Sequence, residues 1–382
     1  MRRIDLRTAV IVLILANLPT WIVIFFTVDQ AKTAIEEEVA ANFRAISGNN
    51  AATMSYAVNN LVREVETLAV NAAVQAAIVA GNASYPRSPD AVRRKITAIE
   101  QAWLQPRGEA TVQRILSNPA SRYLRGFVAI NPAFRRITVT DRFGGTVAAN
   151  VKPIDFEQGD EPWWRQSFRD GVTGQVVIED VRFDPLTQIN VLHIVVPVAN
   201  KSPEEVIGVI GVAVDISDLF LLVTGTPIGA TGNMSLARED GTIIGSEVVD
   251  FPPAQTGDPT STESEDSGHL VAAQLMEVPY FDEILNALRQ PGQPDFIEAT
   301  ALGGGRKMVA FRKLALSSKY PQLRWISIVE QDMSETHIAV DTMNRHLLLA
   351  ALGILVVTIG LAIYLATHGK MEVTDIAETK EG

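Results

Sequence analysis

Two long apolar runs lie near the two ends of the chain, at residues 9–28 and 347–367, and neither contains a charged residue. As helices that rise 1.5 Å per residue, both are long enough to cross about 30 Å of hydrocarbon. A cleaved signal peptide is the alternative for the first run. Its length exceeds the apolar core of about 7–15 residues that signal peptides have, and no small-residue cleavage site precedes the charges that start at Asp29. The pattern therefore predicts two transmembrane helices.

The charges beside these runs predict how the chain is oriented in the membrane. Arg2, Arg3 and Arg7 precede the first run, and Lys370 follows the second. Since positive charge near a span marks its cytoplasmic end, both termini are expected in the cytoplasm, and residues 29–345 are expected outside it. A large, acidic, cysteine-free portion outside the membrane indicates a bacterial inner-membrane protein with a periplasmic domain.

A long helix is predicted directly after the first span. No proline occurs from Asp29 to about Ala80, and apolar residues recur in steps of four and three, which forms a heptad seam. The seam consists of Met54, Val58, Leu61, Val65 and Leu68, and an earlier one of Ile35, Val39, Phe43 and Ile46. Two interpretations stay open: the helix packs along its own domain, or its membrane-proximal half pairs with a second copy of the chain.

The period of the pattern changes after a proline-containing break at Ser84–Pro89. Helices are expected at residues 90–105, 111–116 and 161–170. Short β-branched runs between turn residues predict strands at 127–130, 136–140, 147–149, 175–178, 190–198 and 206–214. The sequences at residues 141–145 and 184–187 are typical of hairpin turns.

A similar series follows, with strands expected at residues 234–237, 242–245, 296–301, 307–314 and 325–330 and a helix at 281–290. Asp240–Gly241 and Gly303–Gly305 are expected turns, and residues 250–268 an expected polar loop. The pattern therefore predicts two copies of one α+β unit, which lie along the long helix between the two transmembrane spans.

Composition excludes several functional classes. A hydrophobic fraction of 47% with 20% charged residues is typical of a folded protein, and a net charge of −11 argues against a nucleic-acid-binding protein. The chain has no cysteine and five histidines, none at metal-ligand spacing, so we expect no metal site. It carries no nucleophile-elbow, zinc-protease or phosphate-loop motif, and an enzyme and a bound cofactor are not expected. The acidic stretch at residues 155–161 is expected to be a solvated loop.

Several motifs together resemble one known family. They are Asp141-x-x-Gly-Gly, Pro162-Trp163-Trp164, Gly171-x-x-Gly174, Asp184-Pro-Leu-Thr, the strand Gly208–Asp215, and then Arg238–Gly245 and Leu323–Glu330. In their order and spacing they are similar to the double Cache (dCache) extracytoplasmic sensor domain of bacterial chemoreceptors and sensor kinases. The resemblance implies an α+β fold in which two tandem PAS-like antiparallel-sheet modules stand on a long N-terminal helix, usually as a homodimer.

The resulting domain boundaries follow the pattern and the resemblance together. We expect a cytoplasmic N-terminus at 1–8, transmembrane helices at 9–28 and 347–367, and a cytoplasmic tail at 368–382. Between them lie the long helix with its connecting helices at 29–105, the membrane-distal Cache module with the ligand pocket at 106–225, and the membrane-proximal Cache module at 226–345.

The resemblance also implies a set of pocket residues. Family members that bind amino acids hold them with tyrosines, an arginine, a tryptophan and a final aspartate, and the matching positions here are Phe156, Glu161, Trp163, Trp164, Arg182 and Asp215. Glutamate at the arginine position would repel a carboxylate, so a typical α-amino acid is disfavoured. Acids facing aromatic rings favour a cationic ligand, whereas Arg182 could neutralise either acid or hold an anion itself. Alternatively, one tryptophan packs on the sheet and the other covers it, and Asp215 caps the next helix.

The function expected from these features is signal transduction: a membrane-anchored sensor that binds a small molecule in the distal module. The family usually has an output domain after the second span, whereas here 15 residues follow Thr367. The sensor is therefore expected to act through a separate partner, or the chain is truncated. The alternative is a non-catalytic scaffold subunit of a membrane complex, in which the chain's own side chains fill the pocket.

Overall fold

The computed structural model describes residues 6–184, 189–200, 205–224, 228–246, 280–290, 295–301 and 304–368. Several expected features lie outside these residues: the loop at 250–268, most of the turn at 184–187, part of the turn at 303–305, the charges at Arg2, Arg3 and Lys370, and nearly all of the C-terminal tail.

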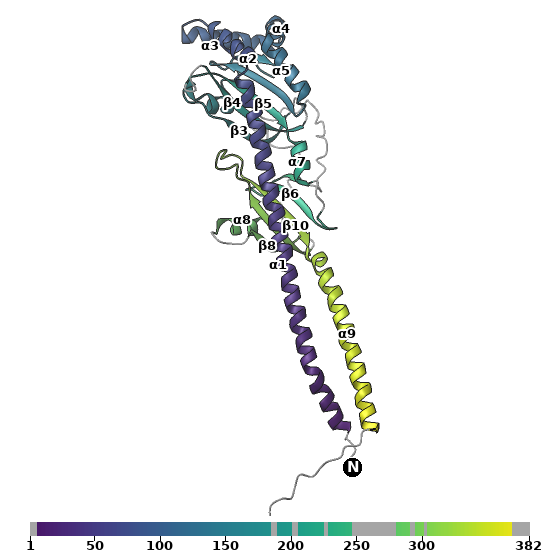
Figure 1. Ribbon diagram of the computed structural model, residues 1–382. Coiled ribbons are helices and arrows are strands. Elements are labelled where there is room, and N and C mark those ends of the chain that lie inside the picture. The colour runs from purple at the N-terminus through teal and green to yellow at the C-terminus, as the bar shows by residue number, and fades with distance from the viewer. Residues whose placement is uncertain are drawn as a thin grey trace, which may run out of the picture.

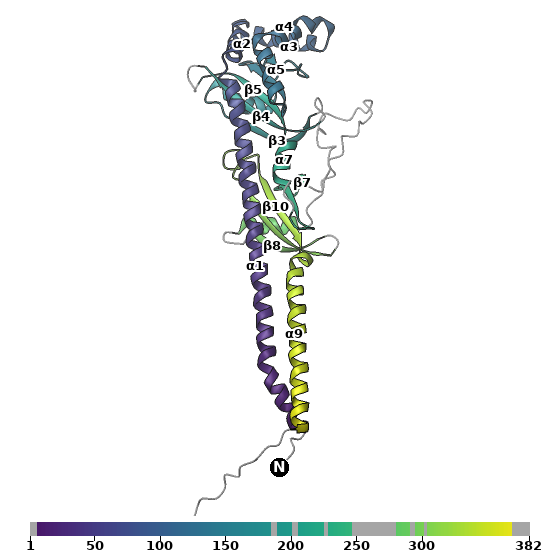
Figure 2. The same cartoon turned by 45° about the vertical axis from the view of Figure 1, so that its right-hand side comes forward.

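One long helix, α1 (Leu6–Ala69), runs alongside two five-stranded antiparallel sheets that lie one beyond the other (Figures 1 and 2). The strands of the first sheet are β1 (Phe134–Asp141), β2 (Thr146–Ala149), β3 (Val177–Asp184), β4 (Ile189–Ala199) and β5 (Val206–Asp215). Those of the second are β6 (Asn233–Arg238), β7 (Ile243–Ser246), β8 (Phe296–Thr300), β9 (Arg306–Lys313) and β10 (Trp325–Asp332).

The two sheets share one topology. The first has the order β2-β1-β5-β4-β3 and the second the order β7-β6-β10-β9-β8, which is the same path five strands later. This repetition confirms the prediction of two copies of one α+β unit. We call the first sheet with its helices the first module and the second sheet with its helix the second module.

Helices cover the ends and faces of both modules. The first module carries α2 (Ala72–Ala83), α3 (Pro89–Trp103), the short η1 (Pro106–Gly108), α4 (Glu109–Ser117), α5 (Pro119–Ile130), α6 (Pro162–Phe168) and the short η2 (Arg169–Gly171). The helix α7 (Ser217–Thr224) connects the two sheets, α8 (Phe281–Arg289) packs on the second, and α9 (Met333–His368) continues directly from β10.

Two predicted elements are wrong. Residues 127–130 are not a strand but the last turn of α5, which Asn118 starts by accepting a hydrogen bond from the Ser121 amide at 2.8 Å. A four-residue apolar run is compatible with either element, and here the helix start decides. The long helix also ends at Ala69 rather than Ala80, because the Asn71 side chain accepts hydrogen bonds from the amides of Ala73 and Val74 and begins α2.

The heptad seam of α1 packs on the chain's own sheets. Met54, Val58, Val65 and Leu68 are at most 1% exposed and belong to the main core with residues of β1, β4 and β5. Earlier on the helix, Phe43 packs with apolar residues of the second sheet. These contacts are the ones expected if the helix packs along its own domain. They do not test dimerisation, which stays a prediction.

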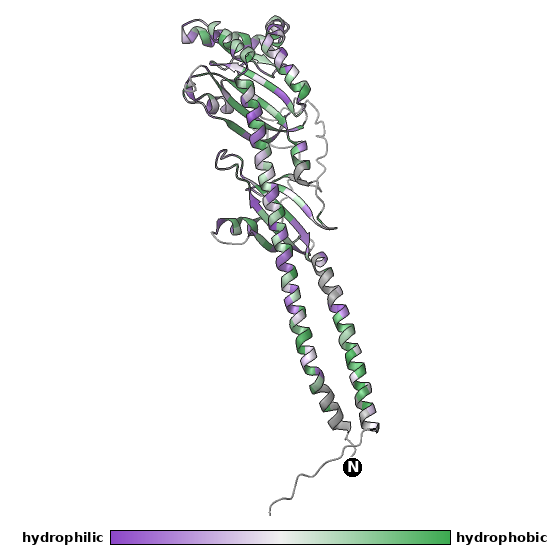
Figure 3. Cartoon of the chain, viewed as in Figure 1, coloured by the Kyte–Doolittle hydropathy of each residue, from purple (hydrophilic) through white to green (hydrophobic). Residues whose placement is uncertain are grey.

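Beyond the second sheet, α9 and the N-terminal part of α1 run side by side, away from both modules (Figures 1 and 2). Among the described residues, one stretch, Asn344–Leu361 of α9, is apolar and long enough to cross a membrane, and it is almost wholly exposed. Figure 3 shows this end of α9 as largely hydrophobic. Between the two helices, the Asn17 amide donates a hydrogen bond to the Thr358 hydroxyl at 3.3 Å.

Candidate functional site

A cavity of about 310 Å³ lies on the face of the first sheet opposite α1. Side chains from β1, β3 and β4 form its floor, and the segment Pro153–Glu161 and Trp163 of α6 cover it. The residues that line it are Arg136, Thr138, Pro153, Ile154, Asp155, Gln158, Glu161, Trp163, Arg182, Asp184, His193 and Gly211. The cavity is therefore polar on its floor and has one large aromatic wall.

Gly211 of β5 lets the aromatic wall lie close to the sheet. A Cβ at this position would lie 3.3 Å from the Trp163 ring and 3.0 Å from Nε2 of His193. The Trp163 ring meets the His193 ring edge to face, with their centroids 5.0 Å apart. Pro162 at the first position of α6 fixes the direction in which Trp163 leaves the backbone.

The cationic side chains of the cavity are already paired with acids. Arg136 forms an ion pair with Asp184 at 3.2 Å, and Arg182 forms one with Glu179 at 3.2 Å. Glu179 also lies 2.7 Å from Nδ1 of His193. Burial lowers the pKa of His193, so its ring is neutral at neutral pH and donates its Nδ1 proton to Glu179.

The pKa of Glu179 reflects these partners. Burial raises it, but the hydrogen bond and charge of His193 and the charge of Arg182 outweigh burial, and the pKa lies below its usual value. Glu179 is thus an ionised carboxylate that holds both a histidine and an arginine in place. Arg182, the more exposed arginine of the cavity, would therefore have to share or leave this ion pair to receive an anionic group.

Two acids of the cavity, Glu161 and Asp155, form no ion pair among the described residues. Within the part of the chain that the structure describes, the Glu161 carboxylate makes no hydrogen bond or ion pair, and Asp155 accepts a hydrogen bond from the neutral Gln158 amide. Burial raises the pKa of Glu161, the charges of Asp155 and Asp160 raise it further, and the charge of Arg182 lowers it by less. Burial likewise raises the pKa of Asp155. The cavity therefore carries negative charge that a bound cation would offset.

The covering segment is anchored to the helices behind it. Glu100 of α3 accepts hydrogen bonds from the amides of Phe156 and Glu157 at 2.8 and 2.7 Å. The Trp103 indole donates a hydrogen bond to the Pro153 carbonyl at 3.0 Å. These bonds fix the backbone from which Asp155 points into the cavity.

Of the residues expected in the pocket, the structure brings Glu161, Trp163 and Arg182 together in this cavity. Phe156 lies on the other side of the covering segment, with its ring centroid 5.6 Å from that of Trp103. Trp164 is buried, stacks on Phe168 and donates a hydrogen bond to the Thr140 hydroxyl at 2.9 Å. It thus packs on the sheet, as the alternative interpretation of the two tryptophans predicted.

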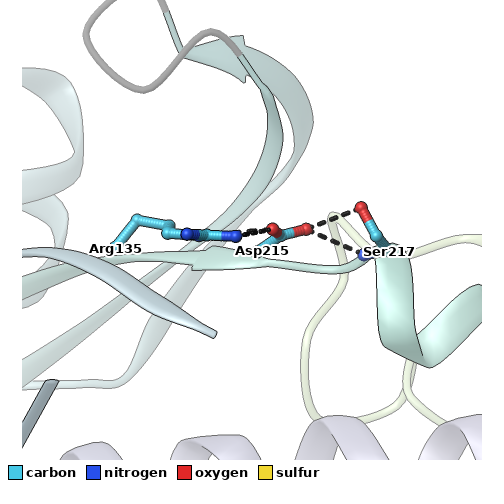
Figure 4. A network of polar contacts seen from close by, with 3 residues as sticks. All are labelled: Arg135, Asp215 and Ser217. Atoms are coloured by element: carbon cyan, nitrogen blue, oxygen red, sulfur yellow. Dashed lines mark hydrogen bonds and ion pairs between the residues drawn. The ribbon is translucent and has the colours of Figure 1, made fainter. Parts of the chain in front are cut away.

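Asp215 lies at the end of β5, between Arg135 and Ser217 (Figure 4). It is not among the residues that line the cavity. Its carboxylate pairs with Arg135 at 2.7 Å and accepts hydrogen bonds from the Ser217 amide at 3.0 Å and hydroxyl at 2.7 Å. Burial raises its pKa, but these bonds lower it more, and the net pKa is below the usual value. Asp215 thus organises the start of α7, which is the alternative that the sequence left open.

Sequence reasoning missed most of the floor of the cavity: Arg136, Thr138, Asp184, His193 and Gly211, together with Asp155 and Gln158 of the covering segment. A signal was present for His193, a lone polar residue in the apolar run of β4. The acidic stretch at 155–161 was expected to be a solvated loop, whereas Asp155 is half buried and lines the cavity.

Comparison with known proteins identifies the family. The family model for the Cache domain, dCache_1, matches residues 31–339. No curated protein matches the chain. Among solved structures, the chain is similar to the ligand-binding domain of the Pseudomonas aeruginosa amino acid chemoreceptor PctB in complex with L-Arg, with 14% identity, 79% of this chain and 98% of that chain covered, and a TM-score of 0.44. It is also similar to the ligand-binding domain of the Campylobacter jejuni chemoreceptor Tlp3 in complex with L-norvaline, with 14% identity, coverage of 80% and 96%, and a TM-score of 0.46.

Proposed function

The chain belongs to the Cache domain family, in its double form, and from this we propose that it is a membrane-anchored sensor that binds a small organic cation in the first module. The proposal rests on the cavity of about 310 Å³, in which Glu161 and Asp155 lie beside the Trp163 ring and form no ion pair. A scaffold would fill this space with its own side chains, so the cavity favours a sensor over a scaffold.

The charges support a cation over an anion or a typical α-amino acid. A positively charged ligand would offset Glu161 and Asp155 and make a cation–π contact with Trp163. A carboxylate would require a free arginine, whereas Arg136 and Arg182 are each paired with an acid of the protein. Binding a carboxylate there would first have to break one of these pairs.

The two long helices support an anchor with two membrane passes. They run side by side away from both modules, and α9 carries the apolar stretch Asn344–Leu361. With both ends in the cytoplasm, the two modules are periplasmic and the ligand reaches them from outside. A homodimer, formed along the exposed side of α1, and a separate cytoplasmic or membrane signalling partner complete the proposal.

Strand β3 offers a route from the cavity to the second module. Glu179 and Arg182 hold residues of the cavity, and the pairing of β3 with β4 is irregular between them. Within that irregular stretch, Asp180 pairs with Arg238 of β6 at 2.8 Å and accepts a hydrogen bond from the Trp325 indole of β10 at 2.8 Å. A shift of β3 on ligand binding would thus reach β10 and α9, which follows it directly.

A ligand biases this route only through a difference in its affinity for two arrangements of the modules. We propose that the cation favours the arrangement in which the covering segment is closed over Glu161 and β3 is drawn towards the cavity. The position of α9 relative to α1 is the output that a partner reads.

The test is a thermal-shift screen of the full chain in nanodiscs against amines, polyamines, quaternary ammonium compounds, organic acids and α-amino acids. A ligand that binds only the folded state at 100 times its Kd adds about 2.7 kcal/mol of stability, which is a readable shift. We expect a cation to give the shift, Glu161→Gln to reduce the stabilisation to about half at the same ligand concentration, and Glu283→Gln on α8 to leave it unchanged. Shifts from organic acids alone, or a cation shift that Glu161→Gln does not alter, would contradict the proposal.

A further inference from the structure

A second and larger cavity, of about 450 Å³, lies in the first module on the other side of the segment that covers the candidate site. Helix α2, Tyr85, the sides of α3 and α4 and the turn between β1 and β2 surround it. Phe156 lines this cavity, while its neighbour Asp155 lines the first one. The two cavities therefore share one backbone segment but have different walls.

The floor of the second cavity is smooth and apolar. Helix α2 presents Ala73, Ala76, Ala77, Ala80 and Gly81 to it. Gly81 is required for close packing, because a Cβ there would lie 2.4 Å from the Val147 side chain of β2. Ile99, Ile115 and Phe156 form apolar walls. A slender apolar group fits such a space, since small side chains leave a trough that larger ones would fill.

The charge of this cavity is opposite in kind to that of the first. Lys95 and Arg114 line it, and within the described residues the Arg114 guanidinium forms no hydrogen bond or ion pair. The Lys95 ammonium donates two hydrogen bonds to Ser84, at 2.7 Å to the carbonyl and 3.1 Å to the hydroxyl, and lies 4.7 Å from the centre of the Tyr85 ring. Its third N–H stays available to a ligand.

The acid among the lining residues is Asp141, and it is enclosed by the protein. It is 1% exposed and accepts hydrogen bonds from the amides of Phe143 and Gly145 and from the Tyr85 hydroxyl. Its oxygens are therefore used within the fold. What the cavity offers to a ligand is an apolar floor, the Arg114 guanidinium and the Lys95 ammonium, whose charge also acts on the Asp141 carboxylate.

We infer that this cavity is a second binding site, for a small monocarboxylate with an apolar body. The apolar body lies along the alanines of α2, and the carboxylate pairs with Arg114 and Lys95. This site does not depend on the proposed cation site, because its lining and its charge are different.

The experiment measures binding of hydrocinnamate to the full chain in nanodiscs by calorimetry, with empty nanodiscs as the blank. Hydrocinnamamide has the same body without the charge. We expect hydrocinnamate to bind and both hydrocinnamamide and the variant Arg114→Gln to show about tenfold weaker binding, since hydrogen bonds between charged groups are the strong ones. Arg94→Gln, a matched exposed arginine of α3 outside the cavity, leaves the affinity unchanged.

A steric variant tests the location independently of charge. Ala80 is exposed and lines the cavity, so Ala80→Trp fills the trough without entering the core and is expected to abolish hydrocinnamate binding. Glu161→Gln, in the first cavity, leaves hydrocinnamate binding unchanged, which separates this inference from the proposed function. Absence of binding at millimolar concentration, equal binding of the amide, or wild-type affinity in both Arg114→Gln and Ala80→Trp would overturn the inference.

Discussion

Asp180 of β3 and Arg238 of β6 form an ion pair that joins the two modules, with 2.8 Å between Oδ2 and Nε. Arg238 also donates a hydrogen bond to the Val181 carbonyl, and the Trp325 indole donates one to Asp180. Both charged side chains are mostly buried, at 25% and 18% exposure. Strand β3, which carries Glu179 beside the cavity, is thus also bound to the second module through Asp180.

We expect Asp180→Asn to uncouple the modules while ligand binding is retained. The substitution leaves a partly buried arginine without its counter-charge, which costs roughly 1–3 kcal/mol. Ligand-dependent distance changes between spin labels on α1 and α9 should be lost, with Kd within about twofold of wild type. The exposed pair Arg324–Glu239 is the matched control, and Arg324→Gln is expected to cost less than about 1 kcal/mol. Unchanged label distances in wild type on ligand addition would contradict this route.

Cation binding should weaken as the pH falls from 7 to 5. The ligand binds the ionised carboxylates, and the pKa values of Glu161 and Asp155 lie above their usual range, so protons compete at a higher pH than for solvated acids. Glu161→Gln is expected to lower the affinity at pH 7 about tenfold and to flatten the pH profile. Calorimetric titration at several pH values measures both effects, and an affinity that rises on acidification would refute the assignment.

Asp141 should make the protein more stable as the pH falls through 6. Burial is the largest cause that raises its pKa, from 3.8 to about 6, against the hydrogen bonds from Phe143, Tyr85 and Gly145 that lower it. The folded state therefore takes up a proton before the unfolded state does, and this group contributes stability below pH 4 that is lost as the pH rises through 6. A pKa shift of about two units between the folded and unfolded states corresponds to a change of roughly 3 kcal/mol in the free energy of unfolding.

Urea unfolding of wild type and Asp141→Asn between pH 4 and pH 7 measures this contribution. The free energy of unfolding of wild type, relative to that of the variant, should increase on acidification, because the asparagine does not titrate. Asp90→Asn, at an exposed position on α3, is the control and should leave the pH dependence as in wild type. A constant difference between wild type and Asp141→Asn over this range would show that Asp141 titrates as an ordinary carboxylate.

Glu100→Ala is expected to loosen the segment that covers the first cavity. It removes the acceptor of two backbone amides, those of Phe156 and Glu157, at a cost of roughly 1–3 kcal/mol. Hydrogen exchange at residues 153–161 should accelerate and ligand affinity should fall, although Glu100 does not line the cavity. Glu109→Ala removes an exposed glutamate that pairs with Gln113 on α4, and neither effect should follow.

The pair Asn17–Thr358 predicts a specific cross-link between the two long helices. The chain has no cysteine, so the variant with Asn17→Cys and Thr358→Cys carries the sole thiols and should form an intramolecular disulfide in membranes. Val357 is 70% exposed and lies on another side of α9, so the variant with Asn17→Cys and Val357→Cys should cross-link much less. Equal yields from the two variants would mean that the helices do not face each other as described.

The sequence alone predicted the repeated architecture, because strand and helix periods are local properties of the chain. Ten of the eleven expected strands differ from the observed ones mainly in their ends. The exception is residues 127–130, where the cap at Asn118 started a helix. The identity of the strand order in the two sheets follows from the same series of elements, repeated. The family resemblance, carried by turns and strand ends, was confirmed by the match to the Cache domain model.

Tertiary structure decided which residues form the site. Glu161, Trp163 and Arg182 could be proposed from their positions in the family motif. The sequence did not show that Arg182 pairs with Glu179 and Arg136 with Asp184, so that Glu161 forms no ion pair of its own. Asp215 was equally compatible with a ligand contact and a helix cap, and its partner Arg135 lies 80 positions earlier in the chain. Arg135 and Asp215, and likewise Arg136 and Asp184, are far apart in the chain and meet only because the sheet forms, so local patterns do not indicate that they neutralise each other. Arg182 and Glu179 are three residues apart and would lie on opposite faces of a regular strand, and the irregular pairing of β3 between them is not visible in the local pattern.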